Sequence, residues 1–390
     1  MRMARYDRLM RHQSTAMARL VRWCAMSNRS DVLREGVLDR IGALIPFDGA
    51  FFATVDPATL LYTSAVRRGM PPGASRAFVR TEFGEDDVNQ LRTLVRAATP
   101  VGWLDGATSG DRGSSLRYRD AMQPFGLGDE LRVALEVDDW CWGLLCLHRA
   151  DAASGFERRE AALLGALGPH LAHGLRRAVV IDHAVEDWTP AGPAVLLVGP
   201  DGTVRATTPA ASGWLDDLAG LDHPRTGELP TAVRAAVART RHPSGPAGES
   251  LVPRARIQTP SGRWVMIQAA HLDGDEDSVA VVLEPATGVM LAPLVVAAYG
   301  FTAREAEVAR RVLAGHARKA IATDLRISLH TVNDHLKAIF EKAAVSSAGQ
   351  LRSRVFAEHY TDVVQAAARA AGSQAVAAQR SSVASRAERQ

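Results

Sequence analysis

The spacing of apolar side chains predicts a long helix near the start of the chain. From residue 7 to residue 45, apolar side chains recur at helical intervals, among them Leu20, Cys24 and Val37. Pro46 cannot donate a backbone hydrogen bond and would clash with the preceding turn, so the helix is expected to end before it. Residues near 7–45 are therefore predicted to be helical.

An alternating pattern follows Pro46 and predicts antiparallel strands. Aromatic and β-branched residues in FDGAFFATVD and LLYTSAV flank a turn at Asp56-Pro57, which indicates a hairpin. Residues 66–130 are rich in Gly, Pro, Asp and Arg, and one helical segment is expected near 85–98. ELRVALEV and WCWGLLCLHR predict two further strands, and FERREAALLGALGPHLAHGLRRAV predicts a long amphipathic helix.

A second mixed region begins after Asp187. PAVLLVGPDGTVRATTPAASGWLDDL reads in order as a strand, an Asp-Gly turn, a strand and a short helix. ARIQTPSGRWVMIQAAHL and SVAVVLEPA predict strands joined by turns at Ser261-Gly262 and Asp273-Gly274. The stretch 242–250 between these parts is expected as a loop. Both mixed regions are thus predicted to be α+β with antiparallel sheets.

The last third of the chain changes to helical periodicity with clear boundary signals. Thr302 and Glu305 form a capping-box pattern that opens a helix, and Gly315 stands where the chain must leave it with a positive φ. A second, shorter helix is expected at about 317–325. A tight turn follows it, and Ser328 is expected to cap a third helix.

The third helix of this segment is predicted to have two different faces. At 100° per residue, one side collects the apolar residues Val332, Leu336, Ile339, Phe340 and Ala343. The other side collects the polar residues His330, Asp334, Lys337 and Glu341. A polar outer face that begins just after a tight turn is the layout of the recognition helix in a helix-turn-helix.

The order of residues over about 296–360 resembles the LuxR-type helix-turn-helix. The matching positions are Phe301, Thr302, Ala303, Arg304, Glu305, Ala306, Glu307, Val308, Gly315, Ile321, Ala322, Leu325, Ile327, Ser328, Thr331, Val332, His335, Leu336, Ile339, Phe340 and Lys342. The resemblance implies a domain that binds double-stranded DNA, with Asn333, Asp334 and Lys337 facing base edges in the major groove. It also implies contacts to phosphates, which are expected from Arg318, Lys319, Ser328, Thr331 and Lys342.

Two positions depart from the pattern of that family. Asn333 stands where a lysine usually follows the Thr-Val pair, which changes the expected base contact. The resemblance further implies a dimerisation helix from Ser347 to His359, with Leu351 and Val355 one turn apart at the contact. Ala348 stands where the family commonly carries arginine, so the strength of the expected homodimer stays open.

Two further resemblances concern the mixed regions. Residues about 15–180 resemble a GAF domain, on the core strand at 142–149 and the start of the closing helix at Phe156. Residues about 190–286 resemble a PAS domain, on early and late hairpins at 199–202 and 260–264, although Thr208 stands where the family often has asparagine. These resemblances imply sensory domains.

The predicted fold class is α+β, with GAF-like and PAS-like antiparallel-sheet domains followed by an all-α four-helix LuxR-type helix-turn-helix domain. The expected domains are 1–182, GAF-like, then 188–287, PAS-like, and 293–360, the helix-turn-helix. Residues 361–390 are rich in Ala, Gln, Ser and Arg and are predicted to be a disordered tail.

Charge is distributed unevenly, in a way that supports a polyanionic partner. Residues 1–294 carry 32 Arg and no Lys against 35 acidic residues, a net charge of −3. Residues 295–360 carry 7 Arg and all three Lys against 6 acidic residues, a net charge of +4, and the tail adds +2. This asymmetry is expected when a small domain meets DNA, although a solvated surface alone could also produce it.

Cysteine count and hydropathy predict a cytoplasmic protein. An odd number of cysteines, three, argues against a disulfide framework. The sequence contains no run of about 20 uninterrupted apolar residues, so no membrane span is predicted. At the amino terminus, arginine or histidine interrupts each apolar run before it reaches the length of a signal peptide.

Signals for catalysis, metals and cofactors are weak. The acidic run at Asp273, Asp275 and Asp277 lacks the glycine that a calcium loop needs at its sixth position. His170 and His173 lack an acidic residue at ligand spacing. No nucleotide fingerprint or nucleophile elbow occurs, so the chain is expected not to be an enzyme and no metal or cofactor is predicted.

The sequence therefore predicts a sequence-specific DNA-binding transcriptional regulator whose amino-terminal domains sense a small molecule or a protein partner. The alternative is a ligand-binding or signalling scaffold that acts through protein contacts without binding DNA. Which residues would bind an effector is unknown. Trp103, Trp140, Trp142 and Phe125 are candidates to line a pocket, but the same side chains could simply fill a core.

Overall fold

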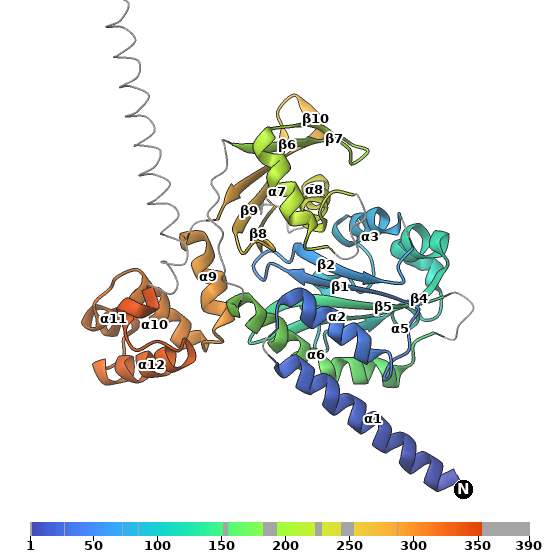
Figure 1. The fold of residues 1–390 in the computed structure, drawn as a ribbon, viewed down its shortest axis with the longest axis horizontal. Helices are drawn as coiled ribbons and strands as arrows, with labels where there is room; N and C mark the ends of the chain where they lie inside the picture. The colour runs from blue at the N-terminus through green and yellow to red at the C-terminus, as the bar shows by residue number, and fades with distance from the viewer. Residues whose placement is uncertain are drawn as a thin grey trace, which may run out of the picture. The chain divides into compact units, whose positions relative to one another are not determined.

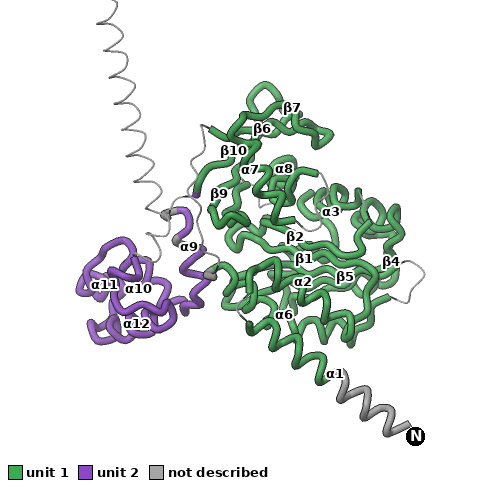
Figure 2. The backbone as a smooth tube through the Cα atoms, in the orientation of Figure 1, with its two compact units in different colours: residues 1–184, 190–285 green, residues 185–189, 286–390 purple. Residues whose placement is uncertain are grey.

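The protein is described from a computed structural model, in which the chain forms two compact units (Figures 1 and 2). One unit comprises residues 1–184 and 190–285, and the other comprises residues 185–189 and 286–390. The structure describes residues 2–26, 28–71, 73–84, 86–150, 155–181, 193–222, 228–242, 253–286 and 288–352. The fold class is α+β, as predicted, with antiparallel sheets in the first unit and helices in the second.

The first sheet has five antiparallel strands in the order β2-β1-β5-β4-β3. Their bounds are Gly49–Val55 for β1, Tyr62–Arg68 for β2, Val101–Trp103 for β3, Leu127–Val137 for β4 and Trp140–Ala150 for β5. The predicted hairpin around Asp56-Pro57 is confirmed, since Phe52 on β1 lies opposite Val66 on β2. The two long strands predicted after residue 130 are confirmed as β4 and β5, which pair along most of their length.

Helices cover both faces of this sheet (Figure 1). On one face α6 (Arg158–Ile181) packs along β4 and β5 and also contacts α1 (Arg2–Ala25) and α2 (Ser30–Ile41). On the other face lies α3 (Ala74–Phe83). Shorter elements complete the region, namely α4 (Leu91–Leu94), α5 (Leu104–Thr108), the 3-10 turns Arg112–Ser114 and Gln123–Phe125, and the π-helical turn Tyr118–Met122.

The amino-terminal helix predicted over 7–45 is two helices in the structure. The chain takes an extended ψ of 152° at Arg29, so the helical hydrogen bonds stop between α1 and α2. Trp23 on α1 donates its indole N–H to the carbonyl of Leu33 on α2, 3.1 Å away, which ties the two helices side by side. The sequence pattern showed one continuous apolar stripe because both helices bury the same kind of face.

The second sheet also has five antiparallel strands, in the order β7-β6-β10-β9-β8. The strands are β6 (Ala194–Val198), β7 (Val204–Thr207), β8 (Arg254–Gln258), β9 (Trp264–Leu272) and β10 (Asp275–Pro285), and the helices are α7 (Pro209–Ala219) and α8 (Thr231–Arg241). The predicted turns at Gly262 and Gly274 are confirmed by φ values of 82° and 85°, which a β-carbon would disfavour. The predicted loop 243–250 lies outside the described residues.

The two sheets share one hydrophobic core. A single cluster of buried apolar side chains includes Tyr62 and Phe83 from the first sheet region and Val233 and Val265 from the second. Polar contacts add to it, because the buried Asp56 carboxylate accepts two hydrogen bonds from the Arg256 guanidinium, at 2.6 and 2.8 Å. The two mixed regions therefore form one compact unit rather than two independent ones.

The second unit is helical. It comprises α9 (Gly288–Ala298), α10 (Ala303–Leu313), α11 (Arg318–Leu325), α12 (Leu329–Lys342) and α13 (Ala348–Arg352). The expected continuation of the last helix to His359 and the expected tail lie beyond the described residues. Among the helices that the structure describes, none is long and apolar enough to span a bilayer.

Candidate nucleic-acid interface

The first helix of the second unit is fixed by a complete capping box. The Thr302 hydroxyl accepts a hydrogen bond from the Glu305 amide at 3.2 Å, and the Glu305 carboxylate accepts one from the Thr302 amide at 2.7 Å. This confirms the predicted helix start, and Gly315 has the predicted positive φ of 86° just after the helix ends. Both features follow from local sequence alone.

A tight turn delivers the chain from α11 into α12. Arg326 takes a left-handed φ of 53° at the end of α11, and Ser328 then caps α12 by accepting a hydrogen bond from the Thr331 amide at 3.0 Å. The predicted Ser328 cap is thus confirmed. The turn lets α11 and α12 pack against each other through Ile321 and Val332, which are both fully buried.

The core of this unit determines which side of α12 faces outward. Val332, Leu336 and Ile339 are each at most 2% exposed and pack against α10 and α11. Because these residues occupy one side of the helix, the residues between them lie on the other side. The structure places Asn333, Asp334 and Lys337 on this exposed side, and they are called the outer face of α12 below.

Polar side chains from α11, α12 and the residues after α12 meet in one shallow groove. The groove has a volume of about 310 Å³ and runs along α12 from the start of α11. Its polar lining comes from Arg318, Asn333, Lys337, Glu341 and Ser346, and its apolar lining comes from Leu336, Phe340 and Val345. Arg318 donates a hydrogen bond to the Asn333 side-chain oxygen at 3.2 Å. One predicted phosphate contact is therefore adjacent to one predicted base contact.

Asp334 has a histidine neighbour on its own helix. The His330 ring nitrogen Nε2 lies 3.6 Å from the Asp334 carboxylate, one turn away. Both side chains are well exposed, so their attraction is screened by water and contributes little to stability.

The predicted phosphate-contacting residues fall into two groups. Arg318 and Lys319 are exposed in the first turn of α11, and Ser328 and Thr331 share a hydrogen bond of 2.9 Å between their hydroxyls at the start of α12. Lys342 lies apart from these four residues. Its ammonium group is 2.6 Å from the Glu305 carboxylate and 3.2 Å from the Gly300 carbonyl.

The pair of Lys342 and Glu305 stabilises the junction of α10 and α12. Burial of the Glu305 carboxylate opposes its ionisation, but hydrogen bonds from Lys342 and Thr302 outweigh that effect and hold its pKa below the ordinary value. The ammonium group has three donors and uses two of them here, so one remains for a phosphate.

One of the two predicted dimerisation residues lies in the described structure. The Leu351 side chain on α13 is 1% exposed and packs in the core of its own domain. A dimer contact through Leu351 and Val355 stays a prediction. Val355 lies outside the described residues.

Comparison with known protein families gives one match, over residues 300–354, to the bacterial regulatory proteins of the luxR family. The matched residues span α10 to α13, including the capping box, the tight turn and the outer face of α12. Residues 300–354 form a LuxR-type helix-turn-helix domain. Among curated proteins no match to the chain was found.

Several solved structures show weak likeness to this chain, over less than half of it in two of the three cases below. Escherichia coli SdiA has 13% identity and a TM-score of 0.31, covering 87% of this chain and 95% of that one. The VqsR LBD domain from Pseudomonas aeruginosa has 14% identity and a TM-score of 0.30, covering 43% and 95%. The Vibrio cholerae VqmA dimer has 18% identity and a TM-score of 0.19, covering 42% and 81%. At these values the likenesses carry no weight for the regions that precede the LuxR-type domain.

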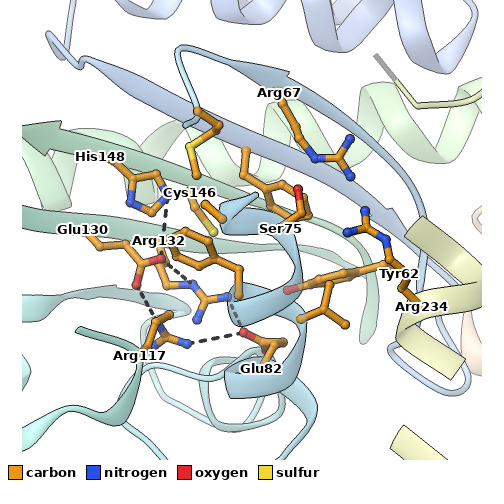
Figure 3. Close-up of a pocket in the computed structure, with 15 residues that line it drawn as sticks. Tyr62, Arg67, Ser75, Glu82, Arg117, Glu130, Arg132, Cys146, His148 and Arg234 are labelled. Atoms are coloured by element: carbon orange, nitrogen blue, oxygen red, sulfur yellow. Dashed lines mark hydrogen bonds and ion pairs between the residues drawn. The ribbon is translucent and has the colours of Figure 1, made fainter. Parts of the chain in front are cut away.

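The unit that precedes the LuxR-type domain holds a small cavity between the first sheet, α3 and α8 (Figure 3). Its volume is about 30 Å³. None of the aromatic residues suggested by the sequence, Trp103, Trp140, Trp142 and Phe125, lines it. Its polar lining comes instead from charged side chains on the strands and helices, including Arg67, Glu82, Glu130, Arg132 and Arg234.

Four of the charged side chains at this cavity form a closed network. The Glu82 carboxylate lies 2.6 Å from Arg132 and 3.4 Å from Arg117, and Glu130 lies 2.9 Å from Arg117. All four side chains are at most 4% exposed. Burial opposes ionisation of Glu130, but the neighbouring guanidinium groups outweigh it and lower its pKa.

A histidine completes the lining next to this network. The His148 ring is 1% exposed and lies 3.9 Å from Glu130. Burial lowers the pKa of His148 to about 4, and the nearby Arg132 acts in the same direction, so the imidazole is neutral at pH 7. One sequence pattern points to part of this network. In ELRVALEV, Glu130 and Arg132 share one face of a strand whose next neighbours are apolar.

Proposed function

We propose that this chain is a sequence-specific DNA-binding transcriptional regulator. The observation that carries the proposal is the division of α12 into a buried face that completes the LuxR-type core and an exposed face with Asn333, Asp334 and Lys337. A helix of 14 residues that presents its polar side after a tight turn fits the major groove of B-form DNA. The family match over residues 300–354 supports the same function.

The outer face of α12 suggests specific base contacts. Asn333 can pair with N6 and N7 of adenine, and Asp334 can accept a hydrogen bond from the amino group of cytosine. Lys337 can donate to the acceptors of guanine. Arg318 holds the Asn333 side-chain oxygen, which leaves the Asn333 amide nitrogen to donate to a base. The Asn333 contact would therefore be partly preorganised by a residue of α11.

Phosphate contacts would position this face on the duplex. Arg318, Lys319, Ser328 and Thr331 surround the starts of α11 and α12, where unpaired backbone amides also favour an anion. We also propose a phosphate contact for Lys342, because its ammonium group has a third N–H donor besides those bonded to Glu305 and Gly300. Since Asn333 replaces a lysine and Asp334 adds a negative charge, we expect weaker non-specific binding and a higher ratio of specific to non-specific affinity.

The regions before the LuxR-type domain would act as sensors in this proposal. We assign a GAF-like sensory role to residues 1–182 and a PAS-like role to residues 188–287, with a small molecule or a protein partner as the signal. A homodimer in the cytoplasm would place two copies of α12 on half-sites about 10 base pairs apart. Sensing would then change the spacing or the availability of the two helices.

The proposal is tested by DNA binding at several salt concentrations. The full chain is titrated against fragments of promoter DNA, and the bound sequence is recovered and used in a gel shift. Lys337→Ala should weaken the specific complex by about 1–3 kcal/mol and relax the preference at one base pair. Arg310→Ala is the matched control, because it removes an exposed positive charge from α10 outside the groove.

The alternative function, a scaffold that works through protein contacts, makes the opposite prediction. Its support is the negative charge of Asp334 on the outer face and the modest net charge of the segment. A scaffold would show no affinity for DNA that falls as salt rises, whereas a regulator must show that dependence. If Lys337→Ala and Arg310→Ala weaken DNA binding equally, the assignment of Lys337 as a base contact is contradicted, while DNA binding itself still stands.

A further inference from the structure

An arginine at the small cavity has donors that no protein atom satisfies. Arg67 lies on β2, is 8% exposed, and donates to the Thr231 hydroxyl through Nη2. Its Nε and Nη1 atoms are buried and have no hydrogen-bond partner among the described protein atoms. Burying a guanidinium without a matching acceptor is costly, so this arrangement requires a physical reason.

The acidic groups nearest to Arg67 are occupied by other partners. The two Asp222 carboxylate oxygens accept hydrogen bonds from the amides of Ala65, at 3.0 Å, and Thr231, at 2.8 Å. Glu228 is paired with the Arg234 guanidinium at 2.8 Å. On the opposite side of the pocket, the Glu82 and Glu130 carboxylates are held in the closed network (Figure 3).

A second arginine adds to the positive charge at the same place. Arg234 on α8 lines the cavity, and its buried Nε atom also lacks a partner among the protein atoms described. Burial lowers the pKa of Arg234, and the charge of Arg67 acts in the same direction. The two guanidinium groups repel each other, and an anion beside both of them would relieve that repulsion.

The remaining walls are apolar and aromatic. Phe51 lies directly opposite Arg67 in the sheet, with the guanidinium 5.9 Å from the ring centroid. Met70, Phe78 and Val79 continue the wall. A cavity of about 30 Å³ has room for about two water-sized groups, which is the size of the two oxygens of one carboxylate.

We propose that this cavity binds the carboxylate of a small apolar organic acid. A short acid lies beside Phe51, and its carboxylate oxygens accept hydrogen bonds from Nη1 of Arg67 and from Nε of Arg234. Nη2 of Arg67 already donates to Thr231, so the carboxylate is shared between two arginines rather than held by one guanidinium fork. The inference rests on the proposed sensory role of this region and specifies the chemical class of its effector.

The position of the two arginines gives the ligand a structural consequence. Arg67 belongs to the first sheet, whereas Arg234 belongs to the helix that follows α7 beside the second sheet. A bound carboxylate therefore joins both parts of the first unit through charge-assisted hydrogen bonds. Occupancy of the cavity would stabilise the contact between the two sheet regions.

The experiment uses the full chain and defined probes. Acetate, butyrate and phenylacetate are titrated by calorimetry and thermal unfolding, each beside its uncharged amide of the same shape. The acids should bind at least about tenfold more tightly than the amides, and affinity should be highest for acetate, because a cavity of about 30 Å³ leaves little room for a longer stem. Inorganic phosphate is included as an anion without a stem.

Variants separate a ligand contact from a structural role. Arg67→Gln should abolish the rise in Tm caused by the acids, while Tm without ligand stays the same or increases because a buried unpaired charge has been removed. Arg67→Lys and Arg234→Gln should each weaken binding of the acids about tenfold or more. These two variants replace Arg67→Gln in the test if that variant does not fold. Arg76→Gln, an exposed arginine on α3 outside the cavity, should change nothing.

Three results would overturn the inference. These are equal binding of acids and amides, binding of phosphate only, and equal losses in Arg67→Gln and Arg76→Gln. DNA binding is measured separately on the same preparations. If the chain binds the acids but not DNA, the proposed regulatory function is contradicted and the carboxylate site stands. If it binds DNA but not the acids, the carboxylate site is contradicted and the proposed regulatory function stands.

Discussion

The two units of this chain treat charged side chains in opposite ways. The first unit holds four charged residues in its packed interior, each at most 5% exposed: Glu82, Glu130, Arg117 and Arg132. In the described part of the second unit, residues 288–352, the only charged residue classed as buried is Glu305, which serves the capping box. Buried charges can only be satisfied by groups of fixed geometry, whereas exposed charges on a helix remain available to a polyanion. The location of charge therefore distinguishes the interior that we propose to bind a small ligand from the surface that we propose to meet DNA.

The largest test of this comparison removes one member of the buried network. Arg132→Met should lower the free energy of unfolding of the first unit by about 3–5 kcal/mol, because it leaves the Glu82 carboxylate without its closest partner. Urea unfolding followed by tryptophan fluorescence reports mainly on this unit, since six of the seven tryptophans belong to it and residues 286–390 contain none. Arg80→Met, which breaks an exposed pair with Asp120, is the control and should cost less than about 1 kcal/mol. Similar losses in both variants would mean that burial does not set the strength of these pairs.

A second test uses pH and is expected to have a slightly smaller effect. The unfolded chain binds a proton at His148 below about pH 6.5, whereas in the folded chain burial lowers the pKa of His148 to about 4. The contribution of the neutral imidazole is complete above pH 6.5 and is lost as pH falls from 6.5 to 4, which amounts to about 3 kcal/mol. His148→Gln should remove this part of the acid sensitivity when unfolding free energies at pH 7 and pH 4.5 are compared. An unchanged difference between the two pH values would contradict the burial of a neutral His148.

The smallest expected effect comes from the exposed start of α10. Thr302→Ala removes the hydroxyl that accepts the Glu305 amide and should destabilise the LuxR-type domain by about 1 kcal/mol. Faster hydrogen exchange of the first-turn amides of α10 would report this loss. Thr323→Ala is the matched control, because its hydroxyl bonds only to the Lys319 carbonyl within α11. Equal rates of hydrogen exchange at these amides in both variants would show that the capping box does not stabilise the first turn of α10.

The LuxR-type domain could be predicted from the sequence in more detail than the first unit. The capping box at Thr302, the positive φ at Gly315 and the cap at Ser328 are local signals, and the structure confirms each of them. The hairpin at Asp56-Pro57 was predicted for the same reason. The predicted helix over 7–45 was wrong as one element, because helical spacing alone does not show where two similar helices separate.

The residues that tertiary packing brings together could not be predicted. The helix α3 and the short strand β3 were missed within the Gly- and Pro-rich stretch, and the helix expected near 85–98 is only α4. Arg67 and Arg234 are far apart in sequence and meet only through the packing of α8 on β2. The hydrogen bond from Arg318 to Asn333 likewise depends on the packing of α11 against α12. Contacts of this kind carry no short-range signal.

The buried pair of Asp56 and Arg256 limits how the polypeptide can be divided for laboratory study. The Asp56 carboxylate receives three hydrogen bonds from Arg256, one of them from the backbone amide. A fragment that stops before residue 190 would retain this aspartate with its counter-charge missing and with apolar surface newly exposed. A fragment that stops near residue 286 would retain both partners. Gene fragments for expression should therefore be cut at that second boundary.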